Sequence, residues 1–379
     1  MIRIICFHLF NDYSGSPKVL NMVLKGLLCK GESIELITSK GGVLDELSAY
    51  SNLKRYAYSY RFSTNPVVTM LRYGRVQLYT FFFAFRYIFC KNTVFYINTL
   101  LPIGPALAGR LMGKRVVYHY HENAFAKGAF YKALAWGMQK LAHEIICVSA
   151  YQASFLKRKK GVSVVPNALP TEFVSRLHPN AEAAFERKTV LMLSSLKEYK
   201  GTREFIELAN RLPQYKFVLV INDTQENIDK YLSDNNLTNI KGGGNLTIYP
   251  RQADVTSFYN AASVVVSLTN PKLVVETFGL TPLEAMSAGL PVIVPNVGGI
   301  AEMVENGVNG YKTDVQDLKQ IQMQIGCMLT DKALYTTLSK AALKRSEKYK
   351  SAETLSLLIK SIENGKEQLK DTISPNRCI

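Results

Sequence analysis

The chain has 379 residues, of which 47% are hydrophobic and 20% are charged. It is too long for one ordinary hydrophobic core and too apolar for a disordered protein, so two globular domains are expected. The six cysteines lack metal-ligand spacing, which indicates a reduced, cytoplasmic protein and not a disulfide framework. The net charge of +16 predicts an acidic partner.

Short runs rich in Val and Ile alternate with helical stretches along the whole chain. The runs expected as strands are Arg3–Phe10, Ser33–Thr38, Val94–Thr99, Arg115–His121, Glu144–Ser149, Val162–Val165, Thr189–Ser194, Lys216–Ile221, Leu246–Tyr249, Val264–Leu268 and Pro291–Val294. Buried runs separated by helices predict an α/β protein with two doubly wound parallel sheets. The start of the chain is too short and polar-flanked for a signal peptide. The most apolar stretch, Leu78–Cys90, is shorter than the roughly 20 residues that span a membrane.

A break in this pattern falls at residues 166–171, and a polar stretch follows it up to Lys188. We therefore place the domain boundary at the break. In a protein with two such domains, the cleft between them is the expected ligand site.

Cations and aromatic rings are most densely mixed between Lys54 and Lys91. The cations and rings that define this mixture are Arg55, Tyr56, Tyr58, Tyr60, Arg61, Phe62, Arg72, Tyr73, Arg75, Phe81, Phe82, Phe83, Arg86 and Tyr87. The mixture suits an anionic membrane surface, with rings at the headgroup level and cations on phosphates. RNA or an ordinary solvated surface are the alternatives. Because no RNA-binding motif accompanies the segment, no nucleic-acid partner is expected.

Glu276 and Glu284 flank a predicted helix start that suits an anion. Thr281 is expected as the N-cap, with Pro282 at N1 and Glu284 at N3 of a Thr-x-x-Glu capping box. Gly279 lacks a side chain where the backbone needs to approach a ligand. The N–H groups of the first turn favour a phosphate, and a carboxylate on each side suits the hydroxyls of a nucleotide-sugar. The alternative is that Glu284 only caps its helix and Glu276 is a solvated loop residue.

The surrounding segment resembles the signature of the retaining glycosyltransferases of family 4, which have the GT-B fold. That signature is a Glu, seven residues, a Glu, a helix, a Gly-x-Pro-Val strand and a Gly-Gly loop. It is matched here by Glu276–Glu284, Gly289-Leu-Pro-Val and Gly298-Gly299. The resemblance implies two Rossmann-like domains facing a cleft. Residues 1–166 would form the acceptor-side domain and 167–345 the nucleotide-sugar-binding domain. A helix at about 346–370 would pack back on the first domain.

The resemblance also implies roles for the residues of this segment. Glu276 would hold hydroxyls of the donor sugar, and Glu284 would hold the ribose. Backbone N–H groups of Phe278, Gly279 and Leu280 would face the sugar and the diphosphate.

Two candidate residues lie in the first domain. Gly15 follows the first strand and permits a tight turn, and the family carries a glycine loop there that approaches donor and acceptor; an ordinary βα turn is the alternative. His119 and His121 lie on one face at a strand end, without a third ligand for zinc. His121, followed by Glu122, matches a family His that points at the donor sugar. A structural His bonded to backbone is the alternative.

Further candidates lie in the second domain. The segment from Leu193 to Gly201 resembles a family loop whose Arg and Lys neutralise the diphosphate. Lys200 matches that Lys, whereas Ser195 stands at the Arg position, which leaves Lys197 or Arg203 to supply the second charge. Arg251 follows the segment where the family binds the base, largely through main chain.

These observations lead to one expected function. No Asp-x-Asp occurs, so neither a metal nor another cofactor is expected. We expect a retaining hexosyltransferase-type glycosyltransferase that uses a UDP- or GDP-linked sugar and a lipid-linked or saccharide acceptor. Its products would be surface polysaccharides, namely capsule, O-antigen or exopolysaccharide. We expect it in the cytoplasm, peripherally bound to the plasma membrane. A nucleotide-sugar epimerase of the same fold and a basic nucleic-acid-binding protein are the alternatives.

Overall fold

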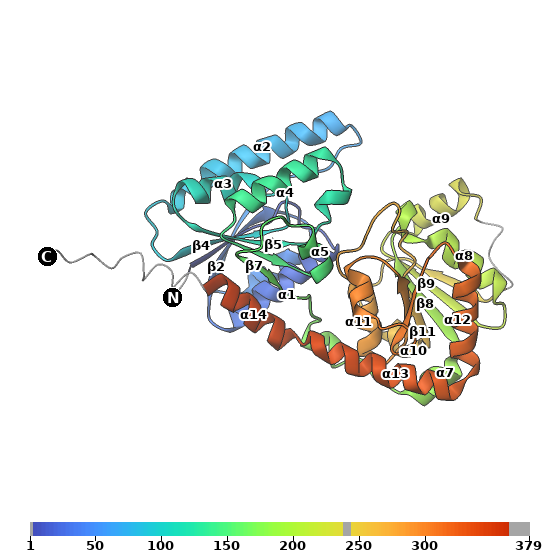
Figure 1. Cartoon of the computed structure of the whole chain (residues 1–379). Helices are drawn as coiled ribbons and strands as arrows, with labels where there is room; N and C mark the ends of the chain where they lie inside the picture. Colours follow the sequence, from blue (N-terminus) through green and yellow to red (C-terminus); the bar gives the residue numbers. More distant parts are fainter. Residues whose placement is uncertain (1–2, 238–243, 364–379) are drawn as a thin grey trace. The chain divides into compact units, whose positions relative to one another are not determined.

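The computed structural model describes residues 3–237 and 244–363. Its contacts divide the chain into two compact units (Figure 1). Unit 1 comprises the chain up to Asn167 and again from Ala352 onward, and unit 2 comprises Ala168–Ser351. Each unit is a parallel sheet flanked by helices, which confirms the predicted class of two doubly wound α/β domains.

Unit 1 contains a seven-stranded sheet in the order β3-β2-β1-β4-β5-β6-β7. The strands are β1 (Arg3–Phe7), β2 (Ser33–Ser39), β3 (Leu53–Tyr58), β4 (Thr93–Asn98), β5 (Arg115–Tyr120), β6 (Glu144–Cys147) and β7 (Val162–Val164). All pairs are parallel. The central strands are buried on both faces, and every residue of β4 is buried. This is why they appear in the sequence as continuous apolar runs.

The helices of unit 1 lie on both faces of this sheet (Figure 1). They are α1 (Gly15–Cys29), α2 (Pro66–Ala84), α3 (Ile103–Leu111), α4 (Ala129–Leu141), α5 (Ala150–Ser154) and α14 (Ser351–Glu363), with short 3₁₀ helices η1 (Val43–Ala49), η2 (Phe85–Tyr87) and η3 (Ala124–Ala126). Helices α2, α3 and α4 form a layer on one face, and α1 and α14 lie on the other.

Local sequence signals set the start of the long helix α2. The Asn65 side chain accepts hydrogen bonds from the N–H groups of Val67 and Val68, and Pro66 occupies N1, where a missing N–H group costs nothing.

Helix α14 belongs to unit 1 although it ends the described chain. The Arg115 guanidinium donates to the carbonyl of Ser361 at 2.8 Å, and the Thr354 hydroxyl donates to the carbonyl of Pro166 at 3.2 Å. A Cβ on Gly26 of α1 would lie 2.6 Å from a methyl of Leu355, so the glycine allows the two helices to approach closely. Residues 364–370 of the expected terminal helix lie outside the described residues.

Unit 2 contains a six-stranded sheet in the order β10-β9-β8-β11-β12-β13, again entirely parallel. The strands are β8 (Thr189–Ser194), β9 (Lys216–Ile221), β10 (Leu246–Tyr249), β11 (Val264–Val266), β12 (Val292–Pro295) and β13 (Gly310–Thr313). The helices are α6 (Thr171–Val174), α7 (Ala181–Arg187), α8 (Thr202–Arg211), α9 (Gln225–Asp234), α10 (Thr256–Ala261), α11 (Leu280–Ser287), α12 (Leu318–Thr330) and α13 (Lys332–Ser346), with 3₁₀ helices η4 (Glu198–Lys200), η6 (Gly299–Met303) and η7 (Glu347–Tyr349).

Two strands were missing from the sequence prediction. Strand β3 lies at the sheet edge, and its residues are only partly buried, so it shows no apolar run. Strand β13 begins at Gly310. Gly310 has φ 153°, and a Cβ there would lie 2.1 Å from the carbonyl oxygen of Val292. Glycine therefore permits the pairing with β12 that makes this segment a strand.

No helix in the described part of the chain is long and apolar enough to cross a membrane.

Candidate functional site

The most promising site in unit 2 lies where two neighbouring strands send their connections in opposite directions. Strands β8 and β11 are adjacent, and the strand order reverses between them. In open parallel sheets, ligands bind outside the carboxyl ends of the strands at such a switch point. The loop after β8 carries Ser195 and Lys200, and the loop after β11 carries Glu276.

Lys200 and Glu276 form an ion pair at this point. The Lys200 Nζ contacts Glu276 Oε1, and the Thr269 hydroxyl donates to the same oxygen at 3.0 Å. The two charged side chains are 28% and 23% exposed, so both are partly accessible to solvent. The sequence singled out both residues but not their contact, and nothing in it pointed to Thr269.

A glycine holds the Lys200 loop against the end of β11. Gly201 has φ 77°, and a Cβ there would lie 2.4 Å from Cβ and 2.5 Å from the carbonyl oxygen of Leu268. The amide of Asn270 donates to the carbonyl of Tyr199 at 2.8 Å. The close approach and the hydrogen bond set Lys200 opposite the chain that leads to Glu276.

A pair of glycines, Gly298 and Gly299, fixes the backbone of Glu276. The Gly299 amide donates to the Glu276 carbonyl at 2.9 Å. Gly298 has φ 106°, and a Cβ there would lie 2.5 Å from the same carbonyl oxygen. The Gly298-Gly299 loop therefore fixes the backbone position from which the Glu276 side chain extends.

Helix α11 starts earlier than the sequence predicted. Its N-cap is Gly279 and no side chain caps it, so Thr281 and Pro282 lie within the first turn. The predicted capping box of Thr281 and Glu284 is therefore wrong. The Gly279 Cβ position is 2.6 Å from Ile300 Cγ1, so packing inside the protein is what requires this glycine.

The first turn of α11 still presents N–H groups that have no partner within the helix. Phe278, Gly279, Leu280 and Thr281 make up this start, which follows Glu276 directly in the chain. Together with the helix dipole, such a turn favours an anion.

Glu284 accepts a hydrogen bond from a buried tyrosine of another helix. The hydroxyl of Tyr259, on α10, donates to Glu284 Oε2. Burial, the Glu284 charge and this hydrogen bond raise the pKa of Tyr259 well above its usual value, so it remains a donor at physiological pH. The contact joins residues from separate helices, and no sequence signal indicated Tyr259.

The remaining candidates of unit 2 also lie at the carboxyl ends of the strands. Ser195 follows the last residue of β8 directly. Arg251 follows β10, two strands away in the sheet, and its Nε donates to the side chain of Asn222 at 2.8 Å. Arg251 thus braces the turn after β9.

In unit 1 the strand order reverses between β1 and β4, and a cluster of histidines lies at the adjacent strand ends. The His121 Nε2 is 3.0 Å from Asn98 Oδ1, and the Asn98 amide nitrogen is 3.1 Å from His8 Nδ1. The rings of His119 and His121 lie 4.1 Å apart between centroids, and the Tyr96 hydroxyl is 2.6 Å from His119 Nδ1.

Burial keeps this histidine cluster neutral. It lowers the pKa of His8 to about 4 and that of His119 to about 3. The pKa of His121 also falls well below its usual value, through burial first and then through the neighbouring histidines. If Asn98 Oδ1 accepts from His121, the His121 proton is on Nε2. His8 and Asn98 were missed, although each is a polar residue at the end of an apolar run.

Glu122, next to His121, has a structural contact. Its Oε2 accepts a hydrogen bond from the Leu100 amide at 3.0 Å. Burial raises the pKa of this carboxyl group.

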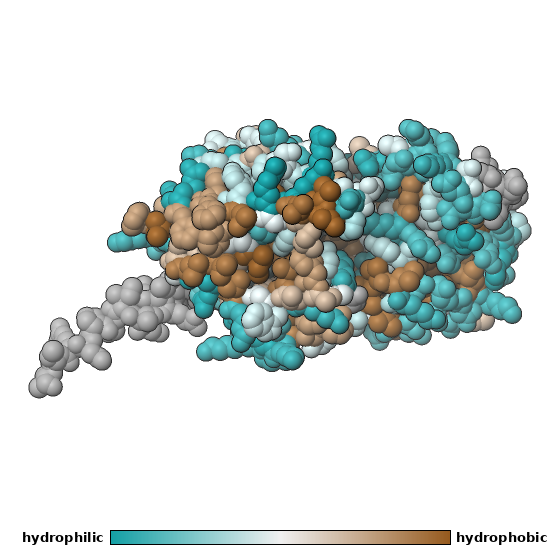
Figure 2. All heavy atoms as spheres, turned by 90° about the horizontal axis from the view of Figure 1, so that it is seen from above, coloured by the Kyte–Doolittle hydropathy of each residue, from teal (hydrophilic) through white to brown (hydrophobic). Residues whose placement is uncertain are grey.

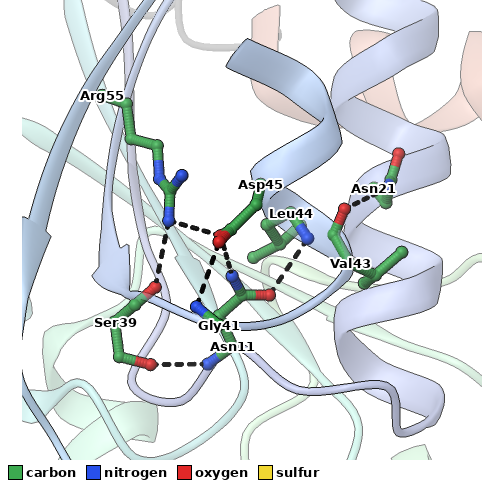
Figure 3. A network of polar contacts seen from close by, with 8 residues as sticks. All are labelled: Asn11, Asn21, Ser39, Gly41, Val43, Leu44, Asp45 and Arg55. Atoms are coloured by element: carbon green, nitrogen blue, oxygen red, sulfur yellow. Dashed lines mark hydrogen bonds and ion pairs between the residues drawn. The ribbon is translucent and has the colours of Figure 1, made fainter.

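A polar network positions the loop that leads to Gly15 (Figure 3). The buried Asn11 donates to Asp45 Oδ1 at 2.6 Å and accepts from the Leu44 amide at 3.0 Å. Arg55 contacts the same Asp45 oxygen at 2.5 Å. Gly15 is the first residue of α1, and the turn before it is closed by Asp12, which accepts from the Ser14 amide at 3.0 Å. The expectation that Gly15 itself makes the turn was wrong.

Thus the structure gathers Ser195, Lys200, Glu276 and the start of α11 at one switch point. Gly15 and His121 lie in unit 1. Among the residues with described positions, no group of three or more His, Cys, Asp or Glu side chains is arranged to hold a metal ion.

Comparison with solved structures shows the same fold. The structure of Anabaena Alr3699/HepE in complex with UDP-glucose superposes with a TM-score of 0.76 at 17% identity, over 96% of this chain and 100% of that one. Sucrose-phosphate synthase from Thermosynechococcus elongatus gives a TM-score of 0.74 at 16% identity, over 98% of this chain and 100% of the other. Both likenesses establish the fold.

Two curated relatives align over shorter segments. The capsular polysaccharide biosynthesis glycosyltransferase CapM of Staphylococcus aureus is 31% identical over 32% of this chain and 30% of its own length. A sucrose synthase of Melioribacter roseus is 44% identical over 20% of this chain. The match spans only 10% of that enzyme.

Two family models match consecutive parts of the chain. The model described as Glycosyltransferase Family 4 matches residues 15–173, and the model described as Glycosyl transferases group 1 matches residues 175–345. The two matches adjoin at residues 173–175, a few residues after the break at 166–171. With the two parallel-sheet units and the GT-B likeness, these matches show that the chain belongs to glycosyltransferase family 4.

Proposed function

We propose that the protein transfers a hexose from a UDP- or GDP-linked sugar to an acceptor, with retention of anomeric configuration. The observation that carries the proposal is the Lys200–Glu276 ion pair at the switch point of unit 2, next to the start of α11. The cation suits a diphosphate, and the carboxylate suits the hydroxyls of a sugar. The HepE complex supports a uridine nucleotide as the first donor to test.

In the unloaded protein the two side chains neutralise each other. A donor would divide them: its diphosphate would take Lys200, and its sugar hydroxyls would donate to Glu276. The N–H groups of Gly279, Leu280 and Thr281 would offset the second part of the diphosphate charge. Ser195 and Phe278 would line the same site, with Glu284 on the ribose and Arg251 near the base.

The transfer step needs no covalent bond to the protein. A bond forms between the acceptor oxygen and the anomeric carbon while the bond from that carbon to the phosphate oxygen breaks. The electron pair leaves with the phosphate, which then takes the acceptor proton. Lys200 and the α11 amides stabilise the charge that grows on the leaving group, without a metal ion.

We assign the acceptor to unit 1. His121 is neutral, so it positions a hydroxyl by hydrogen bonding and does not supply a positive charge. Gly15, at the start of α1, would approach the acceptor. We propose a lipid-linked saccharide of a surface polysaccharide as that acceptor; the CapM relative and the excess of cations support this choice.

Calorimetric titration with UDP and UDP-glucose tests the donor site. Lys200→Met should weaken both ligands, by about 10- to 100-fold, since hydrogen bonds to charged groups contribute about 1.5–3 kcal/mol. Glu276→Gln should weaken UDP-glucose more than UDP, because only the sugar contacts it.

Lys216→Met provides the matched control. Lys216 is the first residue of β9, so it lies at the amino ends of the strands, whereas Lys200 follows the carboxyl end of β8. The donor site is not at Lys200 if the Lys200→Met and Lys216→Met variants bind UDP-glucose equally well and also bind GDP-linked sugars equally well. Stabilisation of the protein by RNA to the same extent as by donors would point to a nucleic-acid-binding protein.

A further inference from the structure

The outer side of the α2–α3–α4 layer of unit 1 is apolar, although it faces solvent. We call it the outer face. Leu71 is 70% exposed, Phe82 69% and Trp136 66%. The other exposed large apolar side chains of these helices are Val67, Met70, Leu78, Tyr79, Leu107, Leu111 and Phe130. Figure 2, which views the molecule from this side, shows brown surface across its left half.

Helix α2 carries apolar side chains on both sides. Its inner side buries Tyr73, Val76 and Ala84 together with Gln77 and Thr80. Its solvent side exposes Leu71, Leu78 and Phe82 at helical spacing, with Arg72 and Arg75 between them. A helix on a water-facing surface normally has a polar stripe opposite its buried one. The solvent side of α2 therefore fits an apolar environment better than water.

The charges on the outer face have one sign. No Asp or Glu occurs between Glu46 and Glu122, or between Glu122 and Glu144, so α2, α3 and α4 contain none. The cations of these helices and the segments beside them are Arg61, Arg72, Arg75, Arg86, Lys91, Arg110, Lys114, Lys127, Lys132 and Lys140. On α4, Lys132 and Lys140 lie one turn either side of Trp136, with Lys140 Nζ 5.9 Å from the indole centroid.

A pocket of about 410 Å³ opens at the start of α2. We call it the arginine pocket; its lining is Ser59, Tyr60, Arg61, Leu71, Arg72 and Arg75. Arg72 braces it by donating to the carbonyl oxygens of Arg61 and Phe62, at 3.0 and 3.3 Å. The ion pairs among the described residues include none of the three arginines. The pocket thus combines unpaired positive charge with the apolar side chain of Leu71.

We propose that the outer face docks on an anionic lipid bilayer, with the arginine pocket holding the phosphate of a lipid headgroup. Exposed rings and aliphatic side chains would enter the boundary between headgroups and acyl chains, and the surrounding cations would face the phosphates. A protein partner would have to match an apolar surface that carries only positive charge. A bilayer rich in acidic lipids supplies both complements at once.

This inference goes beyond the proposed function, because the outer face lies in unit 1 and the donor site lies in unit 2. Docking would bring the enzyme to a lipid-linked acceptor if the proposed function holds. The two proposals can fail separately, since vesicle binding and donor binding are separate measurements.

The test is sedimentation of the full chain with vesicles of phosphatidylcholine, with and without phosphatidylglycerol, at physiological salt. We expect binding to the anionic vesicles and little to the neutral ones. The single tryptophan, Trp136, lies on the outer face, so its fluorescence should shift to the blue on binding.

Two pairs of substitutions separate the apolar and charged contributions. The double substitution Leu78→Glu and Phe82→Glu should lower binding at least 100-fold. The double substitution Arg61→Gln and Arg75→Gln should lower it roughly 30-fold, from about a fivefold contribution per cation. Both variants should keep the melting temperature of the parent protein, which shows that they fold.

Controls come from unit 2. Met323, on α12, is 61% exposed, so Met323→Glu matches the apolar change; Lys340→Gln with Lys344→Gln, on α13, matches the charge change. Neither control should alter vesicle binding. Equal binding to neutral vesicles, or unchanged binding by the Leu78→Glu/Phe82→Glu variant, would overturn the proposal. So would a dimer that this variant dissociates without any vesicle binding by the parent, since the outer face would then be a protein interface.

Discussion

Replacing Gly201 by alanine should disturb the Lys200 loop more than the backbone conformation alone explains. Gly201 and Gly307 both lie in unit 2 and both have φ 77°. A Cβ at Gly201 would lie 2.5 Å from the Leu268 carbonyl oxygen, whereas nothing lies within 4 Å of one at Gly307. The pair therefore separates the cost of a left-handed backbone from the cost of a steric overlap.

The magnitudes follow from these two terms. A left-handed conformation costs a residue with a Cβ about 1–2 kcal/mol, and the stiffer unfolded chain returns about 0.4–1 kcal/mol. Gly307→Ala should therefore lower the free energy of unfolding by about 0–1.6 kcal/mol. Gly201→Ala adds an overpacking term of about 1–3 kcal/mol, which brings its total to roughly 1–4.6 kcal/mol.

Differential scanning calorimetry of the full chain measures the difference. For a domain the size of unit 2, each kcal/mol shifts the midpoint by about 2–4 °C. Gly201→Ala should also weaken UDP-glucose binding, because the overlap moves Lys200 away from Glu276, whereas Gly307→Ala should not. If the two variants have the same midpoint, the close approach of Gly201 to Leu268 is not what requires glycine, and our account of the loop is wrong.

Four further outcomes follow from the structure. Asn11→Ala removes two hydrogen bonds from a buried network and should cost about 2–4 kcal/mol in urea unfolding; a cost below about 1 kcal/mol would contradict the network's importance. The pKa of His119 is about 3 when folded and 6.5 when unfolded, so its contribution to stability is full above pH 7 and is lost as the pH falls from 6.5 towards 3. His119→Gln should give a shallower fall of the melting temperature over that range, and an unchanged slope would refute this. Tyr259→Phe leaves Glu284 without its buried donor and should weaken UDP-glucose binding about tenfold by calorimetry, with unchanged affinity as the contrary result. Because the proposed site offsets the diphosphate with Lys200 and helix amides, excess EDTA should leave donor binding and turnover unchanged, and a loss restored by Mg²⁺ would contradict it.

Much of the site could be predicted from local sequence because its residues lie in short connections after apolar strands. Glu276, the α11 start and the Gly298-Gly299 loop occur within one segment, so their spacing is visible without a fold. Predictions based on backbone chemistry were less successful. Thr281 and Glu284 fit a capping box by spacing, yet in the structure Tyr259 engages Glu284 and the helix begins at Leu280. A buried donor from another helix has no signature in local spacing.

The sequence by itself determined the class of fold, since alternating buried runs and helices permit two parallel doubly wound sheets. It also determined the excess of positive charge along α2, α3 and α4. Only the tertiary structure decided that Lys200 meets Glu276, that His8 and Asn98 join His121, and that the apolar side chains of α2 face solvent. The physical reason is that strand order brings residues that are distant in the chain together at the carboxyl ends of neighbouring strands. Periodicity likewise shows that a helix has two sides, but only packing shows which of them remains exposed.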